Sequence, residues 1–427
     1  MSFLFRHYLL LIALVVAIVI AVIVLSSNGE SGDGPIADNG YSQEEVLAKG
    51  EYLVVAGNCA SCHTTGEGEL MAGGVAFETP FGTIHSTNIT PDLDTGIGSW
   101  TEWDFLNSMR HGIRPNGEHL YPAFPYPAFT KVTNEDLVAM FAYLKSIPAV
   151  KQVQPDNDLS FPFNQRALMA FWKFLYFDSG EFEISEEQTE QWNRGAYLVE
   201  ALTHCSACHT PRNILGAEQE QFYLSGGEYQ DRVGSGEYRT WVAPNITSSN
   251  RGLGLWSHEH LEDYLKTARN DFLESFGPMN EVIMNSSRFL NESDVSAMAL
   301  YLKSLPAIEE PRGVAPDDQL MGQGRTIYNL HCGTCHLPTG EGDPEMAPKL
   351  NRGSLVVQAE NPASMINAIL YSPELPGSPL EPRWLDPMEE FQYILSDEEI
   401  AAVASYIRNS WGNRAGMVLP GQVAAQR

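Results

Sequence analysis

Six cysteines occur in the 427-residue chain, and all of them lie in one short repeated pattern. The three copies are Cys59-Ala60-Ser61-Cys62-His63, Cys205-Ser206-Ala207-Cys208-His209 and Cys332-Gly333-Thr334-Cys335-His336. Disulfide frameworks and zinc sites also use paired cysteines, but neither requires a histidine directly after every second cysteine. C-x-x-C-H is the attachment pattern for haem c. The sequence therefore predicts three covalently attached haems per chain.

Each residue of this pattern has a distinct chemical role. Two thiols spaced two residues apart on one helical turn bond covalently to the two haem vinyl groups, and this fixes the plane of the ring. The adjacent imidazole then reaches the iron as the proximal axial ligand. We therefore predict haem attachment at Cys59, Cys62, Cys205, Cys208, Cys332 and Cys335, and iron ligation by His63, His209 and His336.

The second axial ligand is expected in a loop just ahead of the last helix of each repeat. Gly277-Pro278-Met279 lies there in the second repeat and Asp386-Pro387-Met388 in the third. A methionine opposite histidine raises the potential of an electron carrier, and the preceding proline stiffens the loop. Met279 and Met388 are therefore predicted iron ligands, with core packing as the alternative. The first repeat has Phe124 in this slot, and phenylalanine cannot coordinate iron.

Helical segments flank every copy of the pattern. The sequence predicts a leading helix in residues 46–63, 191–209 and 321–336, and a closing helix in residues 133–148, 291–306 and 396–411. The closing segments begin with Thr, Asn or Ser followed by acidic residues, as helix starts do, and their apolar residues recur at helical spacing. A c-type fold packs its first and last helices against each other over the haem. We therefore predict three small all-α domains.

The first two repeats share a further stretch between these helices. It reads Asn88-Ile89-Thr90 in the first repeat and Asn245-Ile246-Thr247 in the second. Two interpretations remain open, namely hydrogen bonds from these side chains to haem propionates and a purely turn-forming role.

The N-terminus contains an unbroken apolar run from Tyr8 to Leu25, preceded by Arg6 and His7. As a helix it would be roughly 27 Å long, about the thickness of a bilayer hydrocarbon core. A cleaved signal peptide is the alternative, but the run lacks a small-x-small cleavage site. We therefore expect an uncleaved anchor with its N-terminus in the cytoplasm and the remainder exported.

These observations define a predicted architecture. The predicted fold class is all-α, with an N-terminal transmembrane helix followed by three tandem cytochrome c-type domains. The expected segments are an anchor (1–27), a linker (28–40), a first domain (41–150), a connecting segment (151–189), a second domain (190–310), a third domain (316–413) and a C-terminal tail (414–427).

The chain is strongly acidic, with 26 basic and 54 acidic residues and a net charge of -28. Nucleic-acid binding requires the opposite sign, so we expect no nucleic-acid partner. The sequence also lacks a glycine fingerprint for dinucleotides and a nucleophile-elbow motif. Substrate oxidation is therefore expected on another chain.

From about Tyr41 to Asn413, the sequence resembles the tri-haem cytochrome c subunits of bacterial membrane-bound dehydrogenases. The resemblance rests on the three C-x-x-C-H sites and on FGTIHSTNITPDLDTGIGSW, HLYPAFPYPAF, GPMNEVI and SYIRNSWGN. It implies a non-catalytic subunit at the periplasmic face of the inner membrane. It also implies electron transfer from a quinoprotein, flavoprotein or molybdenum dehydrogenase subunit to ubiquinone or to a downstream cytochrome or oxidase.

The first repeat departs from the family pattern at two positions. The family's YPA-x-PY loop carries methionine where this chain has Phe124, and a tyrosine is common where it has His85. Either His85 replaces the missing ligand or the first haem has an open site, and a surface histidine near a propionate is the third interpretation. Two other functions therefore stay open, a haem protein that binds a small ligand at its first haem and a free-standing shuttle to a terminal oxidase.

Overall fold

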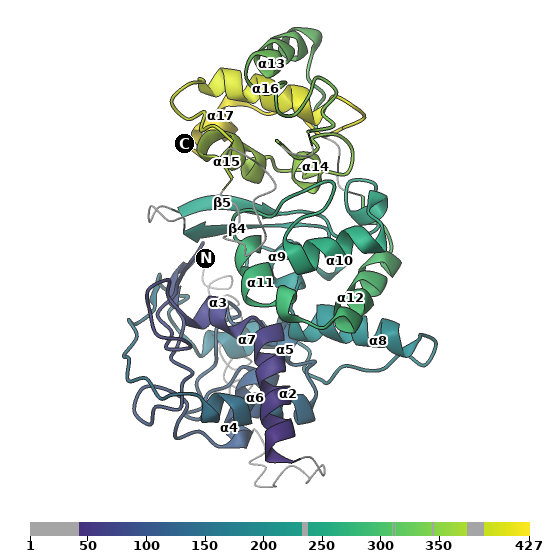
Figure 1. Cartoon of the computed structure of the whole chain (residues 1–427). Helices are drawn as coiled ribbons and strands as arrows, with labels where there is room; N and C mark the ends of the chain where they lie inside the picture. The colour runs from purple at the N-terminus through teal and green to yellow at the C-terminus, as the bar shows by residue number, and fades with distance from the viewer. Residues whose placement is uncertain (1–41, 233–237, 310, 312, 344–345, 374–387) are drawn as a thin grey trace, which may run out of the picture. The chain divides into compact units, whose positions relative to one another are not determined.

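The computed structural model describes residues 42–232, 238–309, 311, 313–343, 346–373 and 388–427 (Figure 1). The predicted anchor and linker, residues 1–40, lie outside this part. The described residues form two compact units. The first contains residues up to Val54 and Cys62–Glu183, and the second contains Val55–Ser61 and Ile184–Arg427.

The first unit is built from helices around a small sheet. Its elements are α2 (Gln43–Ala56, whose end enters the second unit), α3 (Cys59–His63, shared between the units), β1 (Ala76–Thr79), β2 (Gly82–His85), α4 (Glu102–His111), α5 (Tyr126–Phe129), α6 (Asn134–Ser146), β3 (Asp158–Leu159) and α7 (Leu168–Tyr176). The three strands are antiparallel in the order β1-β2-β3, with Ala76 opposite His85 and Gly82 opposite Leu159. The predicted connecting segment therefore contributes a strand and a helix to this unit.

The second unit contains the second and third predicted domains. Its larger elements are α8 (Glu190–Tyr197), α9 (Ser206–His209), β4 (Gly227–Arg232), β5 (Tyr238–Ala243), α10 (His258–Thr267), α11 (Met279–Asn285), α12 (Glu292–Ser304), α13 (Asp318–His331), α14 (Leu355–Gln358), α15 (Ala363–Tyr371), α16 (Asp397–Arg408) and α17 (Pro420–Ala424). Short η turns lie at Leu198–Leu202, Glu220–Phe222, Leu253–Leu255 and Ser287–Phe289. Strands β4 and β5 pair antiparallel, with Gly227 opposite Ala243.

The predicted all-α fold class is wrong. The chain is not all-α, because two small antiparallel sheets follow the first and second C-x-x-C-H motifs. Their strands are only two to six residues long, and the alternation of apolar and polar residues that marks a strand is weak over so few residues. Among the residues that the structure describes, which exclude the predicted anchor, no helix is both long and apolar enough to cross a bilayer.

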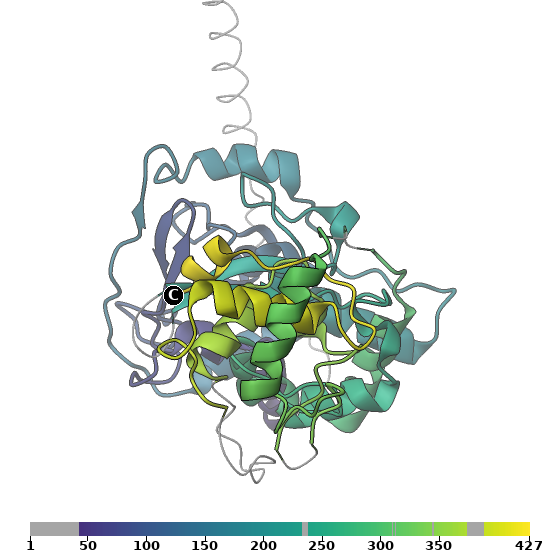
Figure 2. The ribbon, with the colours of Figure 1, turned by 90° about the horizontal axis from the view of Figure 1, so that it is seen from above.

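A glycine mediates the crossing of first and last helices in all three repeats. A Cβ placed on Gly50, Gly195 or Gly324 would lie 2.0, 2.0 or 2.1 Å from the carbonyl oxygen of Ala139, Ala297 or Ala402, respectively. Only glycine permits so close an approach of two helix backbones. In the third repeat, α13 and α16 cross in both views (Figures 1 and 2). The predicted leading and closing helices therefore pack in pairs.

The closing helices begin where the sequence predicts. Thr133, Asn291 and Ser396 are their N-cap residues, and each side chain accepts a hydrogen bond from a backbone N–H in the first turn. Charge reinforces the first two crossings, because Lys49 pairs with Asp136 at 2.7 Å and the Arg194 guanidinium donates two hydrogen bonds to Asp294. Caps and cross-helix ion pairs thus fix the ends of these elements.

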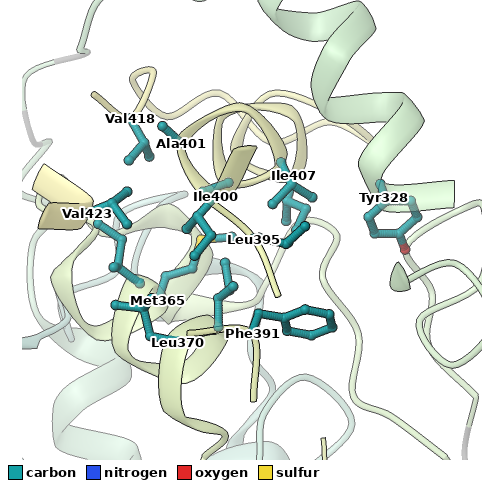
Figure 3. Packing of buried hydrophobic residues seen from close by; sticks show 14 of the residues in the cluster. Tyr328, Met365, Leu370, Phe391, Leu395, Ile400, Ala401, Ile407, Val418 and Val423 are labelled. Atoms are coloured by element: carbon teal, nitrogen blue, oxygen red, sulfur yellow. The ribbon is translucent and has the colours of Figure 1, made fainter. Parts of the chain in front are cut away.

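The hydrophobic core of the third repeat joins α13, α15 and α16 (Figure 3). Its buried members include Tyr328, Met365, Leu370, Phe391, Ile400, Val403 and Ile407. Cys332 and Met388 are partly buried and both pack against this cluster. The attachment cysteine and the predicted distal methionine of the third repeat therefore border one apolar region.

Buried hydrogen bonds join the second and third repeats within the second unit. The buried Arg251 guanidinium donates through Nε and Nη2 to the carbonyl oxygen of Gln358, at 3.1 and 2.7 Å. Trp256 Nε1–H donates to the Gly353 carbonyl at 2.8 Å. Loss of one partner would leave the other buried without its hydrogen bond, which is costly, so these bonds stabilise the joint.

Candidate haem centres

The three motif histidines share one hydrogen-bonding arrangement. His63 Nδ1–H donates to the carbonyl oxygen of Thr87 at 2.6 Å, His209 to that of Pro244 at 2.7 Å and His336 to that of Pro348 at 2.9 Å. A carbonyl oxygen only accepts, so the proton of each imidazole resides on Nδ1. The Nε2 lone pair is then available to a metal, and the carbonyl fixes the orientation of the ring.

Burial favours the neutral form of these imidazoles. Loss of solvent lowers the pKa of His63, His209 and His336, and in each case the hydrogen bond to the backbone carbonyl opposes this lowering. Neutral imidazole is the form that binds metal. The tautomer and the charge of all three side chains are therefore those that a metal-binding imidazole requires.

The paired cysteines lie directly beside these histidines. Helix α3 carries the whole first motif, whereas Cys205 lies just before α9 and Cys332 ends α13. None of the six cysteines forms a disulfide. Burial raises the pKa of the Cys59 and Cys332 thiols to about 12, so they are neutral at ordinary pH.

Haem c fits this donor set better than zinc does. Two thiols and an imidazole on adjacent residues can bond to one porphyrin, whereas structural zinc needs four converging ligands. Among the described residues, no group of three or more His, Cys, Asp or Glu side chains is arranged to hold a metal ion. The chemistry of each motif therefore matches a covalently attached haem.

The Asn-Ile-Thr stretches shape the loops that carry the accepting carbonyls. Asn88 Oδ1 accepts from the backbone N–H and the hydroxyl of Thr90, and its Nδ2 donates to the Val150 carbonyl at 2.7 Å. Asn245 repeats these contacts with Thr247 and Ile308. All four of these Asn and Thr side chains are buried and bonded to protein groups, which supports the turn-forming interpretation.

The accepting carbonyls were not predicted from the sequence. Thr87 and Pro244 directly precede the two Asn-Ile-Thr stretches, and Pro348 precedes Lys349-Leu350-Asn351. A backbone carbonyl has no residue-type signature, so only the repeated position ahead of an asparagine could have indicated the first two. Pro348, in the third repeat, is not followed directly by an asparagine, so no repeated position indicated it.

The predicted distal methionines lie at the expected places in the chain. Met279 is the first residue of α11 and is half-buried, and Met388 is half-buried against the cluster of Figure 3. Asp386 and Pro387 lie outside the described residues. Ligation of iron by Met279 and Met388 remains a prediction.

Phe124 belongs to an aromatic cluster in the first unit. Its ring centroid lies 5.5 Å from that of Phe129 and 6.5 Å from that of Tyr126. Tyr126 is fully buried and meets Trp172 and Phe177 edge to face, at 6.4 and 5.0 Å. The loop that would carry the distal ligand is thus packed against α7 and the residue that follows it.

His85 lies at the end of β2, two residues before Thr87. Its backbone N–H donates to Asn157 Oδ1 at 3.0 Å, and its Nδ1 is buried without a hydrogen-bond partner in the described part of the chain. His85 therefore lies next to the loop that orients His63, whereas Phe124 lies in a different part of the chain. The role of His85 as a replacement ligand stays a prediction.

Comparison with known proteins finds similarity to c-type cytochromes. The cytochrome c family model matches residues 47–148 and 322–411. The chain is 36% identical over 394 residues to a gluconate 2-dehydrogenase cytochrome c subunit of Pantoea cypripedii, covering 89% of this chain and 88% of that protein.

Two further relatives extend this comparison. A cytochrome c subunit of a quinone alcohol dehydrogenase of Gluconacetobacter polyoxogenes is 36% identical over 404 residues, 91% of this chain and 85% of that protein. A diheme cytochrome c-type protein of Cereibacter sphaeroides is 38% identical over 268 residues, 61% of this chain and 86% of that protein. The chain therefore belongs to the family of cytochrome c subunits of bacterial dehydrogenases.

Proposed function

We propose that this chain binds three haems c and transfers electrons from a dehydrogenase catalytic subunit to the quinone pool or the respiratory chain. The observation that carries the proposal is the threefold repetition of an imidazole whose Nδ1–H is held by a backbone carbonyl beside a pair of thiols. When bound, each haem supplies reversible one-electron chemistry between ferrous and ferric iron.

Two observations support a count of three rather than two. The helix crossing at Gly195 and Ala297 and the His209–Pro244 hydrogen bond reproduce in the second repeat what the first and third contain. The family model matches the regions around the first and third motifs, so the second haem rests on this geometry and on Cys205 and Cys208.

Residues of the chain have separable roles in this proposal. The cysteines would attach the haems, and His63, His209 and His336 would bind the iron. Met279 and Met388 would add thioether ligands, which favour the ferrous state and suit an electron carrier. The names of the relatives support a catalytic dehydrogenase partner. We propose that this partner is of quinoprotein, flavoprotein or molybdenum type, and we place the haem domains in the periplasm.

Purification of the native complex tests this function. The cytochrome should co-purify with a dehydrogenase subunit, and that subunit's substrate should reduce all three haems, after which added ubiquinone should reoxidise them. Isolation without any dehydrogenase, with reoxidation only by a terminal oxidase, would indicate a free-standing shuttle.

A second candidate function concerns the first haem alone. Phe124 occupies the position of the expected thioether, and phenylalanine has no donor atom for iron. A five-coordinate first haem would bind a small ligand such as carbon monoxide or nitric oxide. Ligand titration of the reduced protein separates this activity from simple electron transfer.

A further inference from the structure

Helix α7 presents an apolar face to solvent. Leu168, Phe171, Phe174 and Leu175 are 38, 40, 70 and 46% exposed, respectively. Their spacing of three, six and seven residues places them on one side of a helix. A surface helix of a soluble domain normally turns this kind of face inward.

The opposite side of α7 is buried and polar at its centre. Lys173, the one charged residue of the helix, is 9% exposed and lies with Ala170 and Trp172 on the buried side. Its Nζ donates to the carbonyl oxygens of His111 and Gly112, at 2.5 and 2.8 Å, at the C-terminal end of α4. The charged side chain of α7 therefore faces inward together with Trp172, while Leu168, Phe171, Phe174 and Leu175 face outward.

This inverted arrangement is firmly held. Lys173 Nζ lies 4.9 Å from the ring centroid of Tyr126, and Trp172 packs edge to face on the same ring. The hydrogen bonds to α4 and the contacts with Tyr126 fix the rotation of α7 about its own axis. These contacts keep the apolar face of α7 directed outward.

We propose that the outer face of α7 inserts into the interfacial region of a lipid bilayer. This inference deepens the proposed electron transfer to quinone, because it names the surface that would bring the first haem domain to the membrane. Its biological purpose rests on the proposed function, whereas the contact with lipid does not. Phenylalanine and leucine on one face of a helix are the side chains that enter the boundary between headgroups and acyl chains.

The size of the face favours lipid over a protein partner. A nine-residue helix is roughly 13 Å long and about 10 Å wide, so the exposed strip covers on the order of 150 Å². A specific protein interface needs about 800 Å² on each partner. Lipid insertion requires no matching surface, and its strength grows with each apolar side chain that enters.

Charge makes a specific prediction about which lipids suffice. With a net charge of -28, the chain gains nothing from anionic headgroups. Attachment through α7 should therefore occur on uncharged phosphatidylcholine vesicles and should persist at high salt, where attraction between exposed charges is screened.

Site-directed spin labelling of the full, haem-loaded chain tests the proposal. A nitroxide is attached at Phe174→Cys, and its accessibility to oxygen and to a water-soluble nickel complex is measured. The ratio of oxygen to nickel accessibility should be severalfold higher on phosphatidylcholine vesicles than in buffer. The matched control is Glu102→Cys, an exposed position at the start of α4, whose label should keep its accessibility to nickel. An unchanged haem spectrum verifies that both variants are folded.

The outcomes are distinct. A Phe174→Cys label that stays accessible to nickel on vesicle-bound protein would overturn the proposal, as would failure of the protein to bind these vesicles. Protection of the label from both reagents would indicate a protein partner on this face and would also overturn it. Because the label reports lipid contact, the result does not depend on whether electrons reach quinone.

Discussion

Gly324 of α13 lies so close to Ala402 of α16 that a Cβ on Gly324 would sit 2.1 Å from the Ala402 carbonyl oxygen. The same helix offers a matched control in Gly322, where a Cβ would meet nothing within 4 Å. We expect Gly324→Ala to lower the free energy of unfolding of the third repeat by about 1–3 kcal/mol, because overpacking forces the helices apart.

Gly322→Ala should instead raise the free energy of unfolding. Removing glycine from an open helix position stabilises by roughly 0.5–1 kcal/mol. Denaturant unfolding of the haem-loaded protein, followed through haem absorbance, measures both. Equal effects of the two substitutions would show that the crossing at Gly324 is not close in solution.

The distal methionines can be tested one at a time. Met279→Ala and Met388→Ala should each remove the thioether-to-iron absorption of one haem and lower its potential by tens to hundreds of millivolts, since axial ligands move haem potentials over about 0.8 V. Redox titration with optical detection measures this.

Met284→Ala is the control for the second haem, because Met284 lies on α11 with Met279. It should leave every haem spectrum unchanged. If Met279→Ala and Met284→Ala gave the same spectra and potentials, Met279 would be only a packing residue.

The first haem should differ from the other two because Phe124 offers no donor atom. With an open site, the reduced protein binds carbon monoxide at one haem of three, and part of the spectrum is high-spin. With His85 as ligand, that haem is low-spin and resists carbon monoxide until His85→Ala opens it.

Phe124→Met should introduce a thioether ligand and abolish carbon monoxide binding. Three indistinguishable haems with histidine and methionine ligands in the unaltered protein would contradict this prediction. Another methionine would then have to ligate the first iron.

The joint between the second and third repeats should depend on Arg251. Its guanidinium donates to the carbonyl oxygens of Gln358 and Pro311. Arg251→Ala should cost about 2–3 kcal/mol of unfolding free energy, because it removes charge-assisted hydrogen bonds and leaves a buried carbonyl without them.

Lys151→Ala is the comparison, because Lys151 forms an ion pair with Asp94 in which both side chains are about two-thirds exposed. Its removal should leave thermal unfolding unchanged within error, since exposed ion pairs contribute little. An Arg251→Ala protein as stable as the Lys151→Ala protein would show that the buried hydrogen bonds do not hold the repeats together.

The helices that begin with a capping residue were predicted correctly, and the short sheets were not. Thr133, Asn291 and Ser396 specify a helix start through bonds to residues only a few positions away. The strand pairs β1–β2 and β4–β5 carry weak alternation, and their stability comes from packing contacts that no local pattern records.

By itself, the sequence determined the attachment chemistry of this protein, because adjacent cysteines and histidines need no other part of the chain to define a haem c motif. It also determined which helices lead and close each repeat. The tertiary structure decided which carbonyls orient the imidazoles, since Thr87, Pro244 and Pro348 act through backbone atoms that are the same in every residue. It decided the outward direction of Phe174 as well, because the rotation of α7 is set by the contacts of Lys173 and Trp172 with distant residues.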